Sequence, residues 1–409
     1  MVDNTHNAAT TRSKQQRAKR PVYSIAHVSG RWMLQRPDGA PFISLGVAHL
    51  AAAAAYRTAA QPEDRLRFVE QVVVNLREWR FNTAGYHHPA EIRDRLPFIA
   101  DKFLALIPYS VAQPRYPDVF GGYARAVGHL IHRMCTVTKS NPNLIGYYWT
   151  DTPRWDLDTA RRLTNDDWVS AIRRNSAMFP GKRRYVAFLC ERHRADAGAF
   201  HAAYGLNLDE RSLLDSDFAG LPLENPVVHR DDYDFLRIIA REYYRAAGEA
   251  MEREDRRHLV FGDRYMLNDL PAEVLEEALP WIDVVAVQPY HARFEKERFD
   301  GIYRIARKPI LICDHAIGFP TQKYPKTAWE QRATEADAAS AYEHYLSEAF
   351  AEPYIVGYHR CHYADRFVAR RGWLMQGLLS EDATPYAKII ESARRANVAV
   401  LEKLGVAAP

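Results

Sequence analysis

The feature that most constrains the fold of this chain is a repeated alternation of apolar and helix-patterned segments. Helical spacing occurs over residues 63–79, 90–99, 124–139, 231–256, 270–279, 299–306, 333–350 and 384–404. Eight apolar segments, read as buried parallel strands, begin near residues 43, 81, 103, 144, 258, 282, 308 and 354. This alternation predicts a (β/α)8 barrel. A doubly wound open sheet is the main alternative, but residues 46–49 contain no GxGxxG turn.

Sequence outside this alternation defines the limits of the domain. Residues 1–20 are basic and poor in apolar side chains, so we expect a disordered tail. Strand-like pieces around residues 37–39 predict a short β-hairpin before the barrel. Residues 153–225 interrupt the alternation and predict a helical insertion after strand four, within which residues 185–189 are strand-like. We therefore predict one barrel domain over residues 21–409.

Composition excludes several functional classes. The chain is 47% hydrophobic and 26% charged with a net charge of +4, an ordinary globular balance. No apolar run approaches the roughly 18 residues of a membrane span, and no sustained basic and aromatic patch predicts nucleic-acid binding. A secretory leader pattern is not visible, and no CxxC spacing occurs. We therefore expect a cytoplasmic protein with reduced thiols at Cys135, Cys190, Cys313 and Cys361. The oligomeric state is not readable from the sequence.

Polar and aromatic residues collect at the predicted carboxyl ends of the strands, where (β/α)8 barrels hold their active sites. Such a rim suits a sugar, because sugar rings stack on aromatic faces and sugar hydroxyls need many hydrogen-bond partners. We therefore predict a carbohydrate substrate. The candidate substrate-binding residues are His49, His87, His88, Tyr109, Trp149, Asp263, Arg264, Gln288, Tyr290, His291, His315, His359, Arg360 and His362.

Two carboxylates are the catalytic candidates. Asp314 ends the apolar segment 308–316, and Asp151 ends the fourth predicted strand. A carboxylate at the end of a buried strand is costly unless another group pairs with it or uses it. Glycoside hydrolysis uses two carboxyl groups, so Asp151 and Asp314 are the predicted pair. A structural role for Asp314, as a helix cap or as an acceptor for backbone amides, is the alternative.

The histidines raise a second chemistry, that of a metal site. No HxH or HExxH spacing occurs, and the adjacent His87 and His88 lie on opposite faces of a strand. We therefore predict no metal and no cofactor, and keep a His-rich metal-dependent lyase or hydrolase as an alternative function.

Several motifs resemble glycoside hydrolases of family 50, the β-agarase type. The resemblance implies a barrel of the retaining β-glycosidase clan, with catalytic glutamates on strands four and seven. It covers roughly residues 30–390. Its carriers include residues 37–49 (PDGAPFISLGVAH), 79–83 (WRFNT), 141–155 (NPNLIGYYWTDTPRW), 259–264 (LVFGDR), 283–290 (DVVAVQPY) and 355–359 (IVGYH).

The chain departs from that pattern at both catalytic positions. Thr152 stands where the resemblance implies the acid/base glutamate, and Asp314 stands where it implies the nucleophile. After strand eight the sequence His359-Arg360-Cys361 replaces the family's His-Trp-Phe. Because aspartate is one methylene shorter than glutamate, an inverting reaction with a wider carboxylate separation stays open, as does proton transfer by a histidine. Agarose is therefore not the expected substrate.

The leading hypothesis is a glycoside hydrolase acting on oligosaccharides or small glycosides. Arg264 and Arg360 near the strand ends suggest an anionic substrate, since guanidinium groups bind carboxylates and sulfates. Pairing of these arginines with acids such as Asp263 is the structural alternative. A carbohydrate-binding barrel that has lost catalysis is the hypothesis that Thr152 favours.

Overall fold

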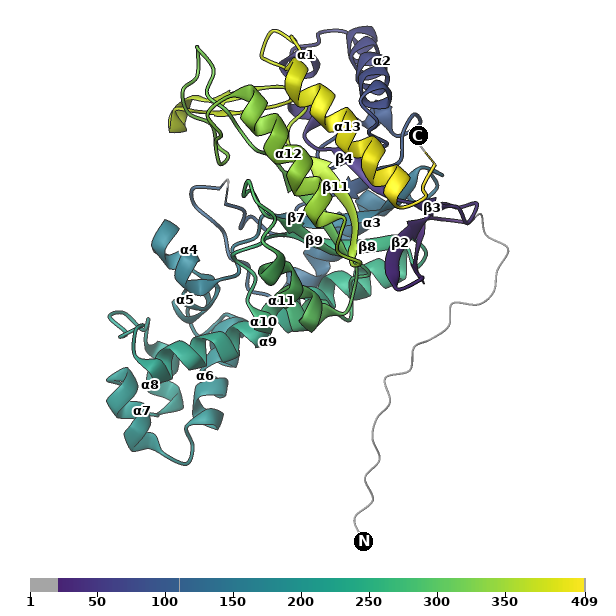
Figure 1. Ribbon diagram of the computed structural model, residues 1–409. Helices are drawn as coiled ribbons and strands as arrows, with labels where there is room; N and C mark the ends of the chain where they lie inside the picture. Colours follow the sequence, from purple (N-terminus) through teal and green to yellow (C-terminus); the bar gives the residue numbers. More distant parts are fainter. Residues whose placement is uncertain (1–20, 110, 408–409) are drawn as a thin grey trace.

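The computed structural model describes residues 21–109 and 111–407, and its centre is a closed barrel of eight strands (Figure 1). Neighbouring strands pair in parallel, and β11 against β4 closes the ring. The predicted (β/α)8 barrel is confirmed. Its strands are β4 (Ser44–Val47), β5 (Thr83–Ala84), β6 (Phe98–Asp101), β7 (Leu144–Asp151), β8 (Leu259–Met266), β9 (Val285–Gln288), β10 (Ile310–His315) and β11 (Ile355–Arg360).

Helices surround the barrel, and the long ones turn an apolar stripe toward it. In α2, for example, the buried residues Val69, Val72, Val73 and Leu76 follow the spacing of one helix face. None of the helices in the described part of the chain is long and apolar enough to cross a membrane. The helices outside the insertion are α1 (Ala54–Arg57), α2 (Pro62–Glu78), α3 (Tyr123–Thr138), α9 (Pro226–Glu254), α10 (Ala272–Ala278), α11 (Lys296–Ala306), α12 (Glu335–Ala349) and α13 (Ala387–Lys403), with 3-10 turns η1 (Leu50–Ala52), η2 (Ala90–Ile92) and η3 (Ala369–Arg371).

A small antiparallel sheet covers the amino-terminal end of the barrel. It consists of β1 (Ser24–Val28), β2 (Arg31–Gln35) and β3 (Pro41–Phe42), and it contains the predicted hairpin. Leu34 and Phe42 are fully buried among barrel-interior residues such as Leu311. A second hairpin, β12 (Arg366–Val368) with β13 (Trp373–Met375), follows the last barrel strand at the opposite end.

Two strand predictions were wrong. The third strand is β6, which overlaps the end of the segment 90–99 that was expected to be helical. The predicted strand 103–109 is a loop in which Phe103 and Leu106 are exposed. Residues 185–189 lie in helix α6. Both segments are short apolar runs, for which periodicity does not separate strand from helix or loop.

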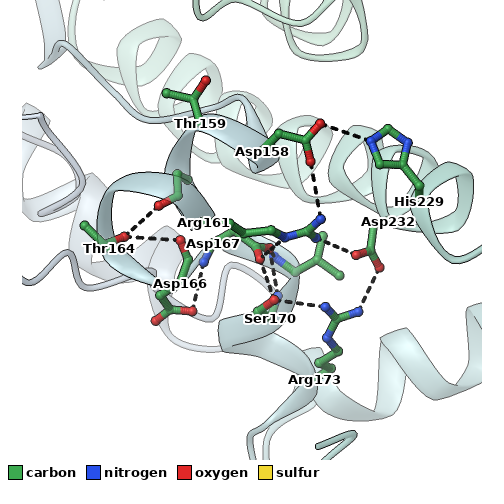
Figure 2. Close-up of polar contacts among 12 residues, drawn as sticks. Asp158, Thr159, Arg161, Thr164, Asp166, Asp167, Ser170, Arg173, His229 and Asp232 are labelled. Atoms are coloured by element: carbon green, nitrogen blue, oxygen red, sulfur yellow. Dashed lines mark hydrogen bonds and ion pairs between the residues drawn. The ribbon is translucent and has the colours of Figure 1, made fainter. Parts of the chain in front are cut away.

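The insertion after β7 is helical, as predicted, and Figure 1 shows it projecting from the barrel along one end of α9. A buried ion network ties it to α9: Arg161 contacts Asp167 at 2.7 Å and Asp232 at 2.5 Å, and Arg173 contacts Asp232 at 2.9 Å (Figure 2). Asp167 also caps α5 by accepting from two backbone amides. The insertion helices are α4 (Leu157–Thr164), α5 (Trp168–Arg173), α6 (Pro180–Arg192), α7 (Ala197–Tyr204) and α8 (Glu210–Asp215). The predicted tail lies outside the described residues.

Candidate functional site

Two carboxylates and one guanidinium form the centre of the barrel mouth. Arg264 of β8 donates from Nη1 to Oδ1 of Asp151 at 2.7 Å and from Nη2 to Oδ2 of Asp314 at 2.8 Å. Arg264 is fully buried, Asp314 is 1% exposed and the Asp151 side chain is 15% exposed. The Arg264 guanidinium lies 3.9 Å from the centroid of the Tyr86 ring, which covers one of its faces. The two predicted catalytic residues are therefore brought together by one cation.

Breaks in strand register aim these carboxylates into the barrel. The register of β10 against β11 shifts between Ile312 and His315, and that of β7 against β8 shifts just before Asp151. Cys313 packs in the barrel interior, so strict alternation would turn Asp314 outward. A register shift of this kind re-aims the side chains that follow it.

The two carboxyl groups have pKa values shifted in opposite directions. Burial would raise the pKa of Asp314, but His49 and Arg264 lower it well below its ordinary value. Burial raises the pKa of Asp151, and Arg264 offsets this only in part. Asp314 is therefore held as a carboxylate, whereas Asp151 retains its proton to a higher pH. Such a divergence separates an acid from a base in a catalytic pair.

His49 connects Asp314 to a cluster around Cys361 and His362. His49 Nε2 lies 3.0 Å from Asp314 Oδ2, and the His49 ring stacks on the His362 ring with centroids 4.2 Å apart. Cys361 and His362 are fully buried, and the Tyr290 hydroxyl lies 3.9 Å from Cys361 Sγ. Donor atoms of His49, Cys361 and His362 lie within 4.8 Å of one another, so these residues could hold a metal ion.

An aromatic pair stands beside the carboxylates. Tyr290 stacks on Trp329 with centroids 4.8 Å apart and an interplanar angle of 4°. The Tyr290 hydroxyl donates to Gln288 Oε1 at 3.0 Å, and Gln288 Nε2 donates to Asp151 at 2.9 Å. Both aromatic side chains are partly exposed. Sequence reasoning missed Trp329 because it lies in the long loop after β10, where no strand end marks it.

Two other predicted residues lie at the periphery of the mouth, and a third is exposed. The Tyr109 hydroxyl donates to Asp269, on the loop after β8. Asn268 donates to His291 Nε2 at 2.9 Å. His87 is exposed, with its ring centroid 5.7 Å from that of His49.

Trp149 and Asp263 point away from the mouth, toward α9. Trp149 is fully buried with its ring centroid 6.2 Å from that of Tyr244. Asp263 accepts from the Tyr244 hydroxyl at 2.9 Å, from Trp155 Nε1 at 3.2 Å and from the Thr150 amide at 3.0 Å. Burial raises the pKa of Asp263 to about 6. Both side chains thus face α9 and the insertion, and their contacts hold these elements against the barrel.

His315 and Arg360 point toward α12. The His315 ring stacks on Tyr345 at 4.0 Å, and its Nδ1 lies 2.7 Å from the Tyr358 hydroxyl. The Arg360 guanidinium lies 5.7 Å from the Tyr342 ring centroid. Arg360 therefore faces the barrel's outer layer, and Arg264 is bound by two carboxylates.

Two further histidines are scaffold residues. His88 is buried, with Nδ1 2.7 Å from the Gly85 carbonyl, and Arg93 Nε donates to its Nε2 at 3.2 Å. His359 lies inside the barrel, where its Nε2 is 2.8 Å from Ser44 Oγ. Burial lowers the pKa of His359 to about 3, so it is neutral at physiological pH.

Comparisons with known proteins concern the whole barrel. No protein-family model matches the chain. The chain is 20% identical over 268 residues to β-agarase B of Vibrio sp. (strain JT0107), a match covering 64% of this chain and 28% of that protein. The structure is similar to an exo-β-agarase with a TM-score of 0.81 at 18% identity, covering 94% of this chain and 65% of the other.

A further agarase structure gives a TM-score of 0.78 at 16% identity, again covering 94% of this chain and 65% of the other. A β-D-glucuronidase from Dictyoglomus thermophilum gives 0.54 at 11% identity, covering 92% and 53%. The chain thus spans about two thirds of each agarase structure and 28% of the curated relative. The resemblance stated from the sequence is confirmed at the level of the fold: this chain has the family 50 agarase-like (β/α)8 barrel.

Proposed function

We propose that this chain is a glycoside hydrolase that cleaves an oligosaccharide or small glycoside with Asp151 and Asp314. The observation that carries the proposal is the pair itself: two strand-end carboxyl groups share Arg264, yet their pKa values move in opposite directions. The agarase-like fold supports a glycosidase.

The environments assign different roles to the two groups. Asp314 is the ionised group and acts as nucleophile or charge stabiliser at the anomeric carbon, through Oδ1, which has no hydrogen-bond partner among the described residues. Asp151 is the proton donor to the leaving glycosidic oxygen, because its raised pKa keeps it protonated at a higher pH. Asp151 and Asp314 contact the two terminal nitrogens of one guanidinium. This favours the short distance between the two carboxyl groups that retaining enzymes have, about 5–5.5 Å.

The surroundings favour a neutral sugar. The Tyr290 and Trp329 rings form a partly exposed platform for a sugar face beside Asp151. Trp329→Ala is expected to weaken sugar binding by about 3- to 10-fold, the scale of one aromatic contact, while Trp329→Phe retains most of it. Isothermal titration with the bound sugar measures both variants. Equal affinities for wild type and Trp329→Ala would exclude the platform.

The test of catalysis is a panel of aryl glycosides and oligosaccharides with three variants. Asp314→Asn and Asp151→Asn are each expected to lower kcat/KM by about 10²–10⁴-fold on the substrate that wild type cleaves. Asp283→Asn is the matched control, because Asp283 lies at the opposite end of the barrel and accepts from the Val260 amide at 2.9 Å. Full activity of Asp314→Asn would refute its assignment.

A carbohydrate-binding barrel without turnover is the second candidate. Thr152 occupies the position of the implied acid/base glutamate, and Asp314 is only 1% exposed. This candidate predicts that Trp329→Ala weakens sugar binding although wild type releases no product. Product from any sugar of the panel, lost in Asp314→Asn, decides in favour of hydrolysis.

A further inference from the structure

A cluster of metal-binding side chains lies beside the carboxylate pair, and only His49 of the cluster contacts a carboxylate of that pair. His49 follows β4, and Cys361 and His362 follow β11. These strands are neighbours in the barrel, paired from Gly357 with Ser44 onward. Fold topology therefore places the three side chains together, with donor atoms within 4.8 Å of one another.

The second observation is that the cluster contains buried polar atoms without partners. His362 is fully buried, and neither of its ring nitrogens has a hydrogen-bond partner among the described residues. Asp314 Oδ1, next to His49, is also buried and unpartnered. An unsatisfied buried polar group is costly, so native proteins rarely keep one without a function or a ligand. Here the unpartnered nitrogens of His362 lie close to the Cys361 thiol.

Local charge favours a cation there. Asp314 is the ionised carboxylate of the pair, and the guanidinium of Arg264 balances its charge. Deprotonation of Cys361 on metal binding adds one net negative charge. A cation bound at the thiolate compensates that charge in a region where these side chains are almost fully buried.

Donor chemistry selects the class of metal. One thiolate and two imidazoles are soft to borderline ligands that suit Zn²⁺, whereas Ca²⁺ and Mg²⁺ require oxygen ligands. The His49 and His362 rings are parallel within 7°, and nitrogen lone pairs lie in the ring planes, so one ring must turn before both can ligate one ion. His362 can turn without breaking a hydrogen bond, because it makes none with the described residues.

We propose that His49, Cys361 and His362 bind one zinc-class divalent cation at the barrel mouth, with Asp314 as the carboxylate that orients His49. A carboxylate beside a metal-bound histidine is a common support for such a ligand. The site goes beyond the proposed hydrolysis, since Zn²⁺ binding does not depend on turnover of any sugar.

The test is Zn²⁺ binding by the full chain after removal of metal with a chelator. Competition with a chromophoric chelator is expected to give one ion per chain, and Co²⁺ is expected to give a thiolate-to-metal charge-transfer band. Cys361→Ser and His362→Gln should each weaken Zn²⁺ binding by about 100-fold or more and should remove the band or shift it. Cys190→Ser, at the half-buried thiol of α6, is the matched control and should change nothing.

Two results would overturn the proposal. One is less than a tenth of an equivalent of Zn²⁺ bound by wild type. The other is unchanged affinity in both Cys361→Ser and His362→Gln, which would place the ion elsewhere on the chain. Circular dichroism of the variants separates loss of a ligand from loss of folding. Because binding is measured without a sugar, failure here leaves the result for Asp314→Asn intact.

Discussion

Removing the Arg264 guanidinium is the sharpest perturbation of the barrel mouth. Arg264→Met replaces the guanidinium with an apolar side chain that still fills part of the space, and it leaves Asp151 and Asp314 without their shared cation. Asp314 cannot regain solvent, since it is 1% exposed. Removing one partner of a buried ion pair costs about 3–5 kcal/mol, because the remaining charge is uncompensated. We expect a loss of this size in the free energy of unfolding at pH 7.5.

The same change predicts a thermal shift and a pH dependence. With an unfolding entropy of about 2.1 cal/mol/K per residue, the 409-residue chain should lose about 4–6 °C in Tm. In wild type the depressed pKa of Asp314 stabilises the fold above the unfolded pKa of about 3.9, and this is lost as pH falls. In the variant only His49 opposes the effect of burial, so the pKa of Asp314 lies above its wild-type value. The difference in stability between the two proteins should therefore grow as pH rises through the range between these two pKa values.

Urea unfolding followed by tryptophan fluorescence at several pH values measures this difference. Arg241→Met is the control, because Arg241 pairs with Glu277 while 55% exposed and such pairs contribute about 1 kcal/mol or less. The double variant Arg264→Met/Asp314→Asn should recover part of the loss. A loss below about 1 kcal/mol, or one that is independent of pH, would show that Arg264 does not neutralise the pair.

Three further predictions concern other carboxylates. Asp151→Asn should remove the basic limb of the pH profile of kcat/KM, since a donor with a raised pKa loses its proton as pH rises; survival of that limb excludes Asp151 as the acid. Burial raises the pKa of Asp269 to about 7, so wild type should lose up to about 1.4 kcal/mol per pH unit as pH rises from about 4 toward 7, with little further loss above that. Asp269→Asn should not show this loss, as urea unfolding at pH 5 and pH 8 would show. Equal slopes contradict this. Asp232→Ala should lower the free energy of unfolding by about 3–5 kcal/mol and speed amide exchange in α4–α6. Asp234→Ala is the control, because its side chain is 41% exposed, and it should do neither. Similar exchange in both variants would show that the network of Figure 2 does not hold the insertion.

The barrel was predictable because its strands and helices differ strongly in apolar pattern. Long helices such as α9 and fully buried strands such as β10 carry many residues of consistent periodicity. The segments that failed are short. β6 has only four residues. The neighbouring segment 103–109 has a more strand-like apolar pattern than β6 itself. Nothing within those few residues tells which of the two pairs with β5.

The candidate site was less predictable because side-chain direction depends on register. From a strand end alone, Trp149 and Asp263 seemed equivalent to Asp151 and Arg264, yet the first two face α9. Gly262 shows why: its φ of 66° breaks the alternation of β8, and a Cβ there would lie 2.6 Å from Ile282 Cγ2. The alternation of residue types in the sequence does not reveal such breaks. These breaks determine which side chain points into the barrel mouth.

The contacts of Arg264 bear on the two positions at which this chain departs from the family pattern. The resemblance implies glutamates where this chain has Thr152 and Asp314. Position 152 therefore has no carboxylate, and the carboxylate at position 314 is one methylene shorter. Arg264 contacts both acids and lowers the pKa of each, while the direct contact of His49 with Asp314 lowers the pKa of that group further and sets the two apart. We expect the stability of the barrel mouth to depend on this buried cation, and the sugar binding that we propose to depend on it as well. Loss of stability without loss of sugar binding in Arg264→Met would break that dependence.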